Sequence, residues 1–152
     1  MNDAVTDRIE KKINISAPLS RVWRAISDAK EFGEWFKVKL EAPFVAGTTV
    51  HGQVTYQGYE HLRVELKIVE LTPERYLAYR WRPNAIDPQK DYSAEPMTLV
   101  EFKLEPAPGG TLLTLVESGF DGIPLERRAE AFRGNESGWS AQLLNIERYV
   151  AH

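Results

Sequence analysis

Two stretches decide the fold: Ile15-Ser16-Ala17-Pro18 followed by Val22-Trp23-Arg24-Ala25-Ile26 near the start, and Gly138-Trp139 with Leu143 and Ile146 near the end. The first stretch ends a strand and begins an amphipathic helix, because proline interrupts strand pairing but fits the first turn of a helix. The second lies on the apolar face of a long predicted helix. Between them, apolar and polar residues alternate, which predicts antiparallel strands bracketed by helices.

This alternation, together with the turn residues that interrupt it, sets the predicted elements. We expect a first strand at Arg8–Ile15, then the helix around Val22 and a short helical turn around Trp35. A hairpin over 50–56 and 62–71 follows, and three later strands turn these residues to one face: Leu77, Tyr79 and Trp81; Val100, Phe102 and Leu104; Leu113 and Leu115. A long helix over 124–149 has an apolar stripe of Leu125, Ala129, Phe132, Trp139, Leu143, Ile146 and Val150.

The order of these elements predicts the fold class. We expect an α+β fold in which a curved antiparallel sheet of six to seven strands packs on a long C-terminal helix, with two short helices after the first strand. A chain of 152 residues is a usual size for one domain, and no repeat or linker interrupts it. The prediction is therefore a single domain over residues 1–152.

Composition and charge exclude several classes of function. The net charge is −3 and the basic residues are dispersed, so we expect no nucleic-acid partner. No stretch approaches the ~20 apolar residues of a membrane span, and no basic segment leads into an apolar one at the start, which favours a cytoplasmic protein. Cysteine is absent and the three histidines lack metal-ligand spacing, so we expect no thiolate chemistry, metal or cofactor.

Aromatic side chains are abundant on the predicted inward faces. For any one ring, core packing is the more common role, but together the rings favour an apolar cavity between the sheet and the long helix. The loop over 83–96 has three prolines and little apolar content, so we expect it to rim the mouth of that cavity. The candidate wall consists of Trp35, Phe36, Tyr56, Tyr79, Trp81, Phe102, Phe120, Phe132, Trp139 and Leu143.

Two carboxylates join this set of candidate ligand-binding residues. Glu136 falls on the apolar stripe of the long helix, four residues after Phe132 and three before Trp139, where it is either solvated at the cavity mouth or a polar anchor for a ligand. Glu117 shares a strand face with Leu115 and so turns inward. If the two faced one another in an apolar cavity, one could act as a general acid or base, although we favour a role in orienting a ligand.

Two glycines interrupt the long helix. Gly134 and Gly138 each cost about 1 kcal/mol relative to alanine in a helix interior and therefore need a reason. Close approach of the sheet, a bend, or room for a ligand would each supply one.

A series of short motifs runs along the chain: Ile15-x-Ala17-Pro18-x-x-x-Val22-Trp23, Trp35-Phe36, Gly47, Leu77-x-Tyr79-x-Trp81, Thr98-Leu99-Val100-x-Phe102, Gly110-Thr111, Glu117-Ser118-Gly119-Phe120 and Gly138-Trp139-x-x-x-Leu143. In these motifs and in the order of its elements the chain resembles the START-related, birch-pollen-allergen-like superfamily, and within it the family of activators of the heat-shock protein 90 ATPase. The resemblance covers nearly the full length and implies a helix-grip fold with a deep apolar cavity. Related domains bind lipids or hormones, cyclise polyketides or assist a chaperone.

Three functions stay open at this point. We favour binding of a small apolar molecule, aromatic or lipid-like, without a covalent step. The resemblance offers a stress-response interaction module with a chaperone as partner as one alternative, and an enzyme of the polyketide cyclase or aromatase kind as another. The exposed edges of the predicted sheet allow a monomer or a homodimer.

Overall fold

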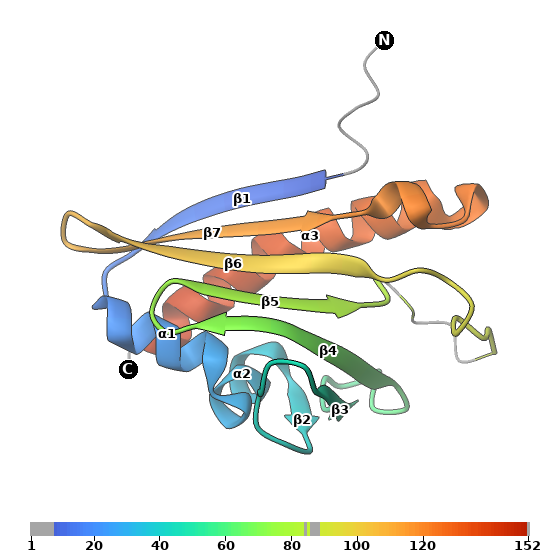
Figure 1. Ribbon diagram of the computed structural model, residues 1–152, viewed down its shortest axis with the longest axis horizontal. Coiled ribbons are helices and arrows are strands. Elements are labelled where there is room, and N and C mark those ends of the chain that lie inside the picture. The colour runs from blue at the N-terminus through green and yellow to red at the C-terminus, as the bar shows by residue number, and fades with distance from the viewer. Residues whose placement is uncertain (1–7, 84, 86–88, 152) are drawn as a thin grey trace, which may run out of the picture.

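The computed structural model describes residues 8–83, 85 and 89–151 and has the predicted α+β architecture. Its sheet runs antiparallel throughout, in the order β1-β7-β6-β5-β4-β3-β2 (Figure 1). The strands of the described residues are β1 Arg8–Ile15, β2 Val38–Leu40, β3 Thr49–Val54, β4 Arg63–Thr72, β5 Tyr76–Trp81, β6 Thr98–Ala107 and β7 Gly110–Ser118.

Helices α1 (Leu19–Ser27) and α2 (Ala29–Phe36) follow β1 in the chain and precede β2. Asp28 separates them, and its carboxylate accepts hydrogen bonds from the first backbone N–H groups of α2, which is the ordinary role of an N-cap aspartate. The indole Nε1 of Trp35 donates to the carbonyl oxygen of Ala25 at 2.8 Å and so ties the two helices together. A short 3-10 helix, η2 (Phe120–Gly122), then leads into the long helix α3 (Leu125–Val150).

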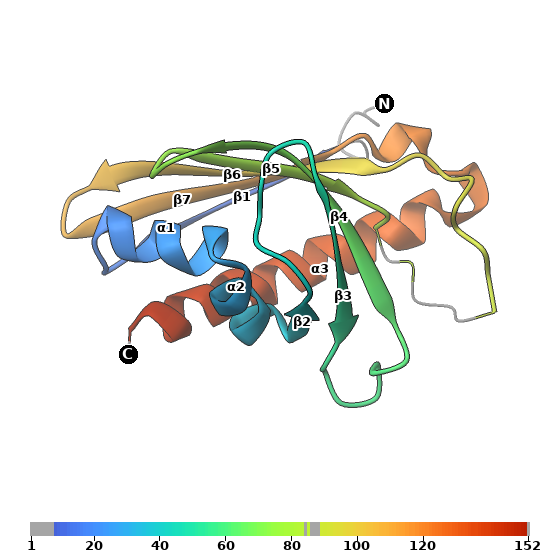
Figure 2. The same cartoon turned by 60° about the horizontal axis from the view of Figure 1, so that its bottom comes forward.

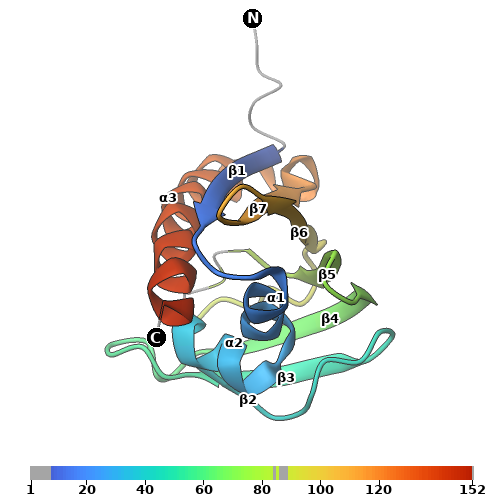
Figure 3. The same ribbon diagram turned by 90° about the vertical axis from the view of Figure 1, so that its left-hand side faces the viewer.

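The sheet curls strongly, and α3 lies along the open side between β1 and β2, the two edge strands of the sheet (Figure 3). One end of the curl is covered by α1 and α2, and the other by the connection between β5 and β6 (Figures 1 and 2). We call the first the capped end. The second, where β5 finishes at Trp81 and β7 at Ser118, we call the cavity end.

Most predicted elements are confirmed, with one strand added. The first strand has the predicted bounds, and α3 begins and ends one residue later than expected. The extra strand, β2, has only three residues and therefore no alternation long enough to predict it. Four residues of the predicted loop over 83–96, namely 84 and 86–88, lie outside the described residues.

The predicted apolar stripe of α3 is wrong in the first two turns of the helix. Leu125 is 75% exposed and Ala129 is also exposed, whereas Arg127 is buried at 6% exposure. The guanidinium of Arg127 bonds the Glu95 carboxylate at 2.7 Å and the Pro83 carbonyl oxygen at 3.0 Å, which neutralises it inside the protein. The face of the helix that turns inward here is thus set by an ion pair with the β5–β6 connection, which hydrophobic spacing alone does not reveal.

Candidate functional site

A buried carboxylate lies at the centre of the cavity end. Glu117 is 0% exposed, and each of its oxygens accepts two hydrogen bonds. Trp81 Nε1 and Thr98 Oγ1 donate to Oε2 at 2.8 and 2.6 Å. Trp139 Nε1 and Asn135 Nδ2 donate to Oε1 at 2.8 and 2.9 Å. The four donors come from β5, β6 and α3, so this one carboxylate joins the sheet to the long helix.

Strand register explains how the sequence brings these groups together. Glu117 on β7 is opposite Val100 on β6, and Val100 is opposite Tyr79 on β5, so all three side chains turn inward in one row. Trp81 is opposite Thr98, one step further toward the cavity end. On α3 the two donors are four residues apart and therefore lie on the same face of the helix.

The donors around Glu117 suit an ionised carboxylate. Indole and amide N–H groups can only donate, and an ionised carboxylate can only accept. Burying a charge without such partners is costly, and here hydrogen bonds from neutral groups replace the lost hydration. Because all four bonds come from the protein, the carboxylate acts on the cavity through the two indoles that it orients. Direct contact between Glu117 and a ligand stays a prediction.

Tyr79 lies beside this carboxylate with its hydroxyl unpaired. It is 0% exposed, and its Oη is the one enclosed side-chain polar atom without a hydrogen-bond partner in the part of the chain that the structure describes. Burial, followed by the charge of Glu117, raises the pKa of the Tyr79 phenol well above its usual value. The ring packs edge-on against Trp81 with centroids 5.5 Å apart, so Tyr79 supports the aromatic wall from behind.

Two adjoining hollows meet at Trp81 and Asn135. The larger, of about 460 Å³, lies between the ends of β3, β4 and β5 and the β5–β6 connection. Its lining combines the less polar residues Val54, Leu62, Val64, Ala85 and Tyr92 with the more polar His51, Arg63, Glu65 and Arg82. The smaller, of about 130 Å³, extends along α3 and is lined by Phe36, Trp81, Asn135, Gly138, Trp139 and Gln142. Together they form a cavity with an aromatic wall beside α3 and charged side chains in the larger hollow, and aromatic side chains with convergent polar groups are typical of small-molecule sites.

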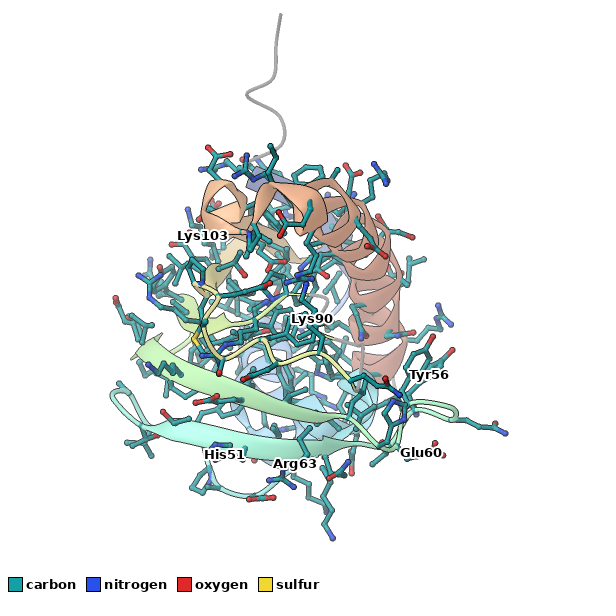
Figure 4. All side chains as sticks on the ribbon, turned by 90° about the vertical axis from the view of Figure 1, so that its right-hand side faces the viewer. His51, Tyr56, Glu60, Arg63, Lys90 and Lys103 are labelled. Atoms are coloured by element: carbon teal, nitrogen blue, oxygen red, sulfur yellow. The ribbon has the colours of Figure 1, made fainter. Side chains whose placement is uncertain are left out.

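Charged side chains surround the mouth of this cavity. Arg82 bonds Glu65 at 3.0 Å and the carbonyl oxygen of Tyr92 at 3.0 Å, so it fastens the β5–β6 connection to β4. Figure 4 faces this end and shows Lys90 on that connection, with His51 and Arg63 on the strands β3 and β4. The mouth is therefore polar, and the interior behind it is aromatic.

A larger open groove of about 1000 Å³ runs between α2 and β2, away from Glu117. Its lining mixes acidic and basic side chains, among them Lys30, Glu34, Lys37 and Glu41. No aromatic pair and no buried polar cluster faces it within the described residues. Size alone favours this groove, but in the parts of the chain that the structure describes only the cavity end has an aromatic wall held by a buried carboxylate, so we place the candidate site there.

Gly138 on α3 lines the smaller hollow. A Cβ atom built at this position meets nothing within 4 Å, so close approach of the sheet does not explain the glycine. Room for a ligand beside the helix is consistent with this open space and stays a prediction, as does a bend in the helix.

Apart from Glu117, the predicted site residues fall into three groups. Phe36, Trp81 and Trp139 line the cavity, with the two indoles 5.7 Å apart between centroids. A second group belongs to the hydrophobic core and consists of Trp35, Tyr79, Phe102 and Leu143. The third group is apart from the cavity. It comprises the pair Phe120 and Phe132, the exposed Tyr56 at the tip of the β3–β4 hairpin (Figure 4), and the exposed Glu136.

Asn135 takes the place that the sequence suggested for Glu136. One residue corresponds to about 100° of rotation around a helix, which carries the Glu136 side chain out to solvent and brings Asn135 toward Glu117. The spacing of four residues between Asn135 and Trp139 could have indicated this, because residues four apart lie on the same face of a helix. Thr98 and Arg127 had no comparable signal, because their partners lie on other elements.

The described residues contain no group of three or more histidine, aspartate or glutamate side chains placed to bind a metal ion. Among these same residues, no helix has the length and apolar character needed to cross a membrane.

Comparisons with solved structures support the helix-grip fold. Protein MLL2253 from Mesorhizobium loti is similar with a TM-score of 0.74 and 24% identity, covering 95% of this chain and 96% of that one. The Aha1 dimer from Colwellia psychrerythraea gives 0.70 and 17%, covering 94% and 95%. DynU16, from the dynemicin biosynthetic locus, gives 0.72 and 22%, covering 95% of this chain but 47% of that one. At these identities the likeness shows a shared fold.

The sequence comparison is more specific. No curated protein matches. Residues 16–151 match the family described as Activator of Hsp90 ATPase homolog 1-like protein, which confirms the resemblance seen in the sequence. Because this match spans most of the chain, the protein belongs to the Activator of Hsp90 ATPase homolog 1-like family.

Proposed function

We propose that the protein binds a small, largely apolar molecule, aromatic or lipid-like, in the cavity formed by the two hollows. The observation that carries this proposal is the orientation of Trp81 and Trp139 by the buried carboxylate of Glu117. Both indole N–H groups are used inside the protein. The wall therefore offers aromatic surface to a ligand, and Asn135 supplies a polar group beside it.

The size and chemistry of the cavity support the same proposal. A hollow of about 460 Å³ is in the range of small-molecule sites, and its smaller extension follows α3 past a glycine whose missing side chain leaves room. A buried charge with four protein donors is an expensive way to fix two side chains that a plain apolar core could hold by packing. Precise placement of the two indoles is a benefit that a binding site would use.

The family offers a second candidate, a chaperone-associated interaction module. The matching family takes its description from an activator of the Hsp90 ATPase. A change in the ATPase rate of an Hsp90 on addition of this protein would favour that candidate, and an unchanged rate would count against it.

Native mass spectrometry of the freshly purified protein tests ligand binding, with organic extraction and identification of any compound that leaves with it. We expect a stoichiometric apolar compound on the wild type. It should be lost from Trp81→Ala, which removes part of the wall, and retained by Trp23→Ala.

Trp23 is a matched control because it is a half-buried tryptophan on α1 outside the cavity lining. Equal retention by the two variants would contradict the proposed site. A wild type that carries no compound and shows no saturable binding of 2-naphthol, an apolar fluorescent probe, would contradict the proposed function.

A further inference from the structure

The orientation of the Asn135 side-chain amide is fixed by Glu117. The amide has one donating and one accepting end, and the Glu117 carboxylate only accepts. Asn135 Nδ2 therefore faces Oε1, at 2.9 Å, and the opposite assignment would place two acceptors against one another. This leaves Oδ1 as the end of the amide that is free to meet other groups.

The Oδ1 atom has no hydrogen-bond partner among the described residues, yet it is not enclosed. An unpaired side-chain polar atom that was sealed in the interior would be a second case like Tyr79 Oη, which is the one such atom in the described part of the chain. Asn135 is half-buried and lines both hollows. Its accepting oxygen is therefore accessible to solvent, on a residue that lines both hollows.

The other groups of the smaller hollow do not compete for this role. The indoles of Trp81 and Trp139 carry only donors, and both donate to Glu117. Gln142 also lines the hollow, but its Oε1 already accepts a hydrogen bond from Asn145 Nδ2 at 3.0 Å. Asn135 Oδ1 is thus the side-chain acceptor of the smaller hollow that makes no hydrogen bond to another described residue, whereas Gln142 Oε1 already makes one.

We propose that Asn135 Oδ1 accepts a hydrogen bond from the ligand, and that the ligand is an apolar molecule bearing a hydroxyl or N–H donor, as a phenol or an aromatic amine does. This inference rests on the proposed function and narrows it. An acceptor that the bound ligand covers discriminates between analogues, because an analogue without the donor shields that acceptor from water and leaves it unpaired.

The test compares two probes of similar shape, 2-naphthol and 2-methylnaphthalene, in the wild type and in Asn135→Leu. The affinity ratio of the two probes is measured in each protein by titration, so differences in their hydration cancel. We expect the ratio to shift against 2-naphthol by about two- to tenfold in Asn135→Leu, the usual range for one hydrogen bond. Asn135→Ala serves the same comparison if the leucine variant does not fold, since alanine suits a helix interior.

Gln142→Leu is the matched control, because it removes an amide from the same wall whose oxygen is already used. It should leave the ratio unchanged. An unchanged ratio in Asn135→Leu, or an equal shift in Gln142→Leu, would overturn the assignment of Asn135 while leaving the binding site in place. Absence of saturable binding of either probe to the wild type would overturn the inference and the proposed function together.

Discussion

The two ends of the molecule satisfy the indole N–H groups of their tryptophans in different ways. At the capped end, Trp35 donates to the backbone oxygen of Ala25, ten residues away in a neighbouring helix. At the cavity end, Trp81 and Trp139 lie 36 and 22 residues from Glu117 and both donate to its carboxylate. The backbone acceptor is brought into place when α1 packs on α2, and it carries no charge. A buried carboxylate, in contrast, must lose its hydration and then be fully hydrogen-bonded. The cavity end therefore depends on one side chain, and the capped end does not.

The largest expected effect follows from removing that side chain. Glu117→Leu leaves four donors without an acceptor, and we expect the free energy of unfolding to fall by about 4 kcal/mol. Trp35→Phe removes one hydrogen bond at the capped end and should cost about 1 to 2 kcal/mol. Urea denaturation of both variants measures the difference. Equal losses would contradict the contrast between the two ends.

Glycine-to-alanine substitutions should have opposite signs at the two ends. A Cβ at Gly33 in α2 would lie 2.2 Å from the Val38 carbonyl oxygen, so Gly33→Ala should destabilise the protein by about 2 kcal/mol. Gly138→Ala meets nothing within 4 Å and should stabilise it by about 1 kcal/mol through helix propensity.

The same methyl group at Gly138 enters the smaller hollow, so Gly138→Ala should also bind 2-naphthol more weakly than the wild type. Thermal or urea denaturation and a probe titration give the two readouts. Tighter binding together with higher stability would show that Gly138 has no part in leaving room for a ligand.

A smaller effect distinguishes two tyrosines on β5. The Tyr79 hydroxyl has no partner, so Tyr79→Phe should raise the free energy of unfolding by about 1 kcal/mol. Tyr76 donates a hydrogen bond to Glu101, so Tyr76→Phe should lower it by about 1 kcal/mol. Denaturation at pH 7 compares the two. A loss of stability in Tyr79→Phe would mean that its hydroxyl is paired in solution, for example with an enclosed water.

The same tyrosine predicts a dependence on alkaline pH. Burial raises the pKa of Tyr79 in the folded protein, so above pH 10 the unfolded chain loses the phenolic proton while the folded protein keeps it. The contribution of the Tyr79 phenol to the free energy of unfolding is therefore fully present below pH 10. As the pH rises above 10, this contribution is lost and stability falls. Tyr79→Phe should flatten that fall by about 1.4 kcal/mol per pH unit. An unchanged alkaline slope in the variant would contradict the burial of this phenol.

The sequence predicted the framework well because periodicity reports which face of an element is buried. It indicated correctly that Glu117 turns inward, since strand alternation fixes that face. It did not indicate the partners of Glu117, because they depend on the register among β5, β6 and β7 and on the rotation of α3. The wrong prediction for the first two turns of α3 has the same cause, a contact with a distant element. Arg127 is buried there by Glu95, a residue on a loop whose position no local pattern records.

The cavity end should bind the ligand and the capped end should not, and the four tryptophans report directly on this difference. Two of them, Trp81 and Trp139, line the cavity, whereas Trp23 and Trp35 belong to α1 and α2. A ¹H–¹⁵N correlation spectrum of the indole N–H groups, recorded during titration with 2-naphthol, tests it in one experiment. We expect saturable shifts for the Trp81 and Trp139 signals, with the signals of the other two tryptophans nearly unmoved. Larger shifts at Trp23 and Trp35, or none at any of the four at saturating probe, would contradict it.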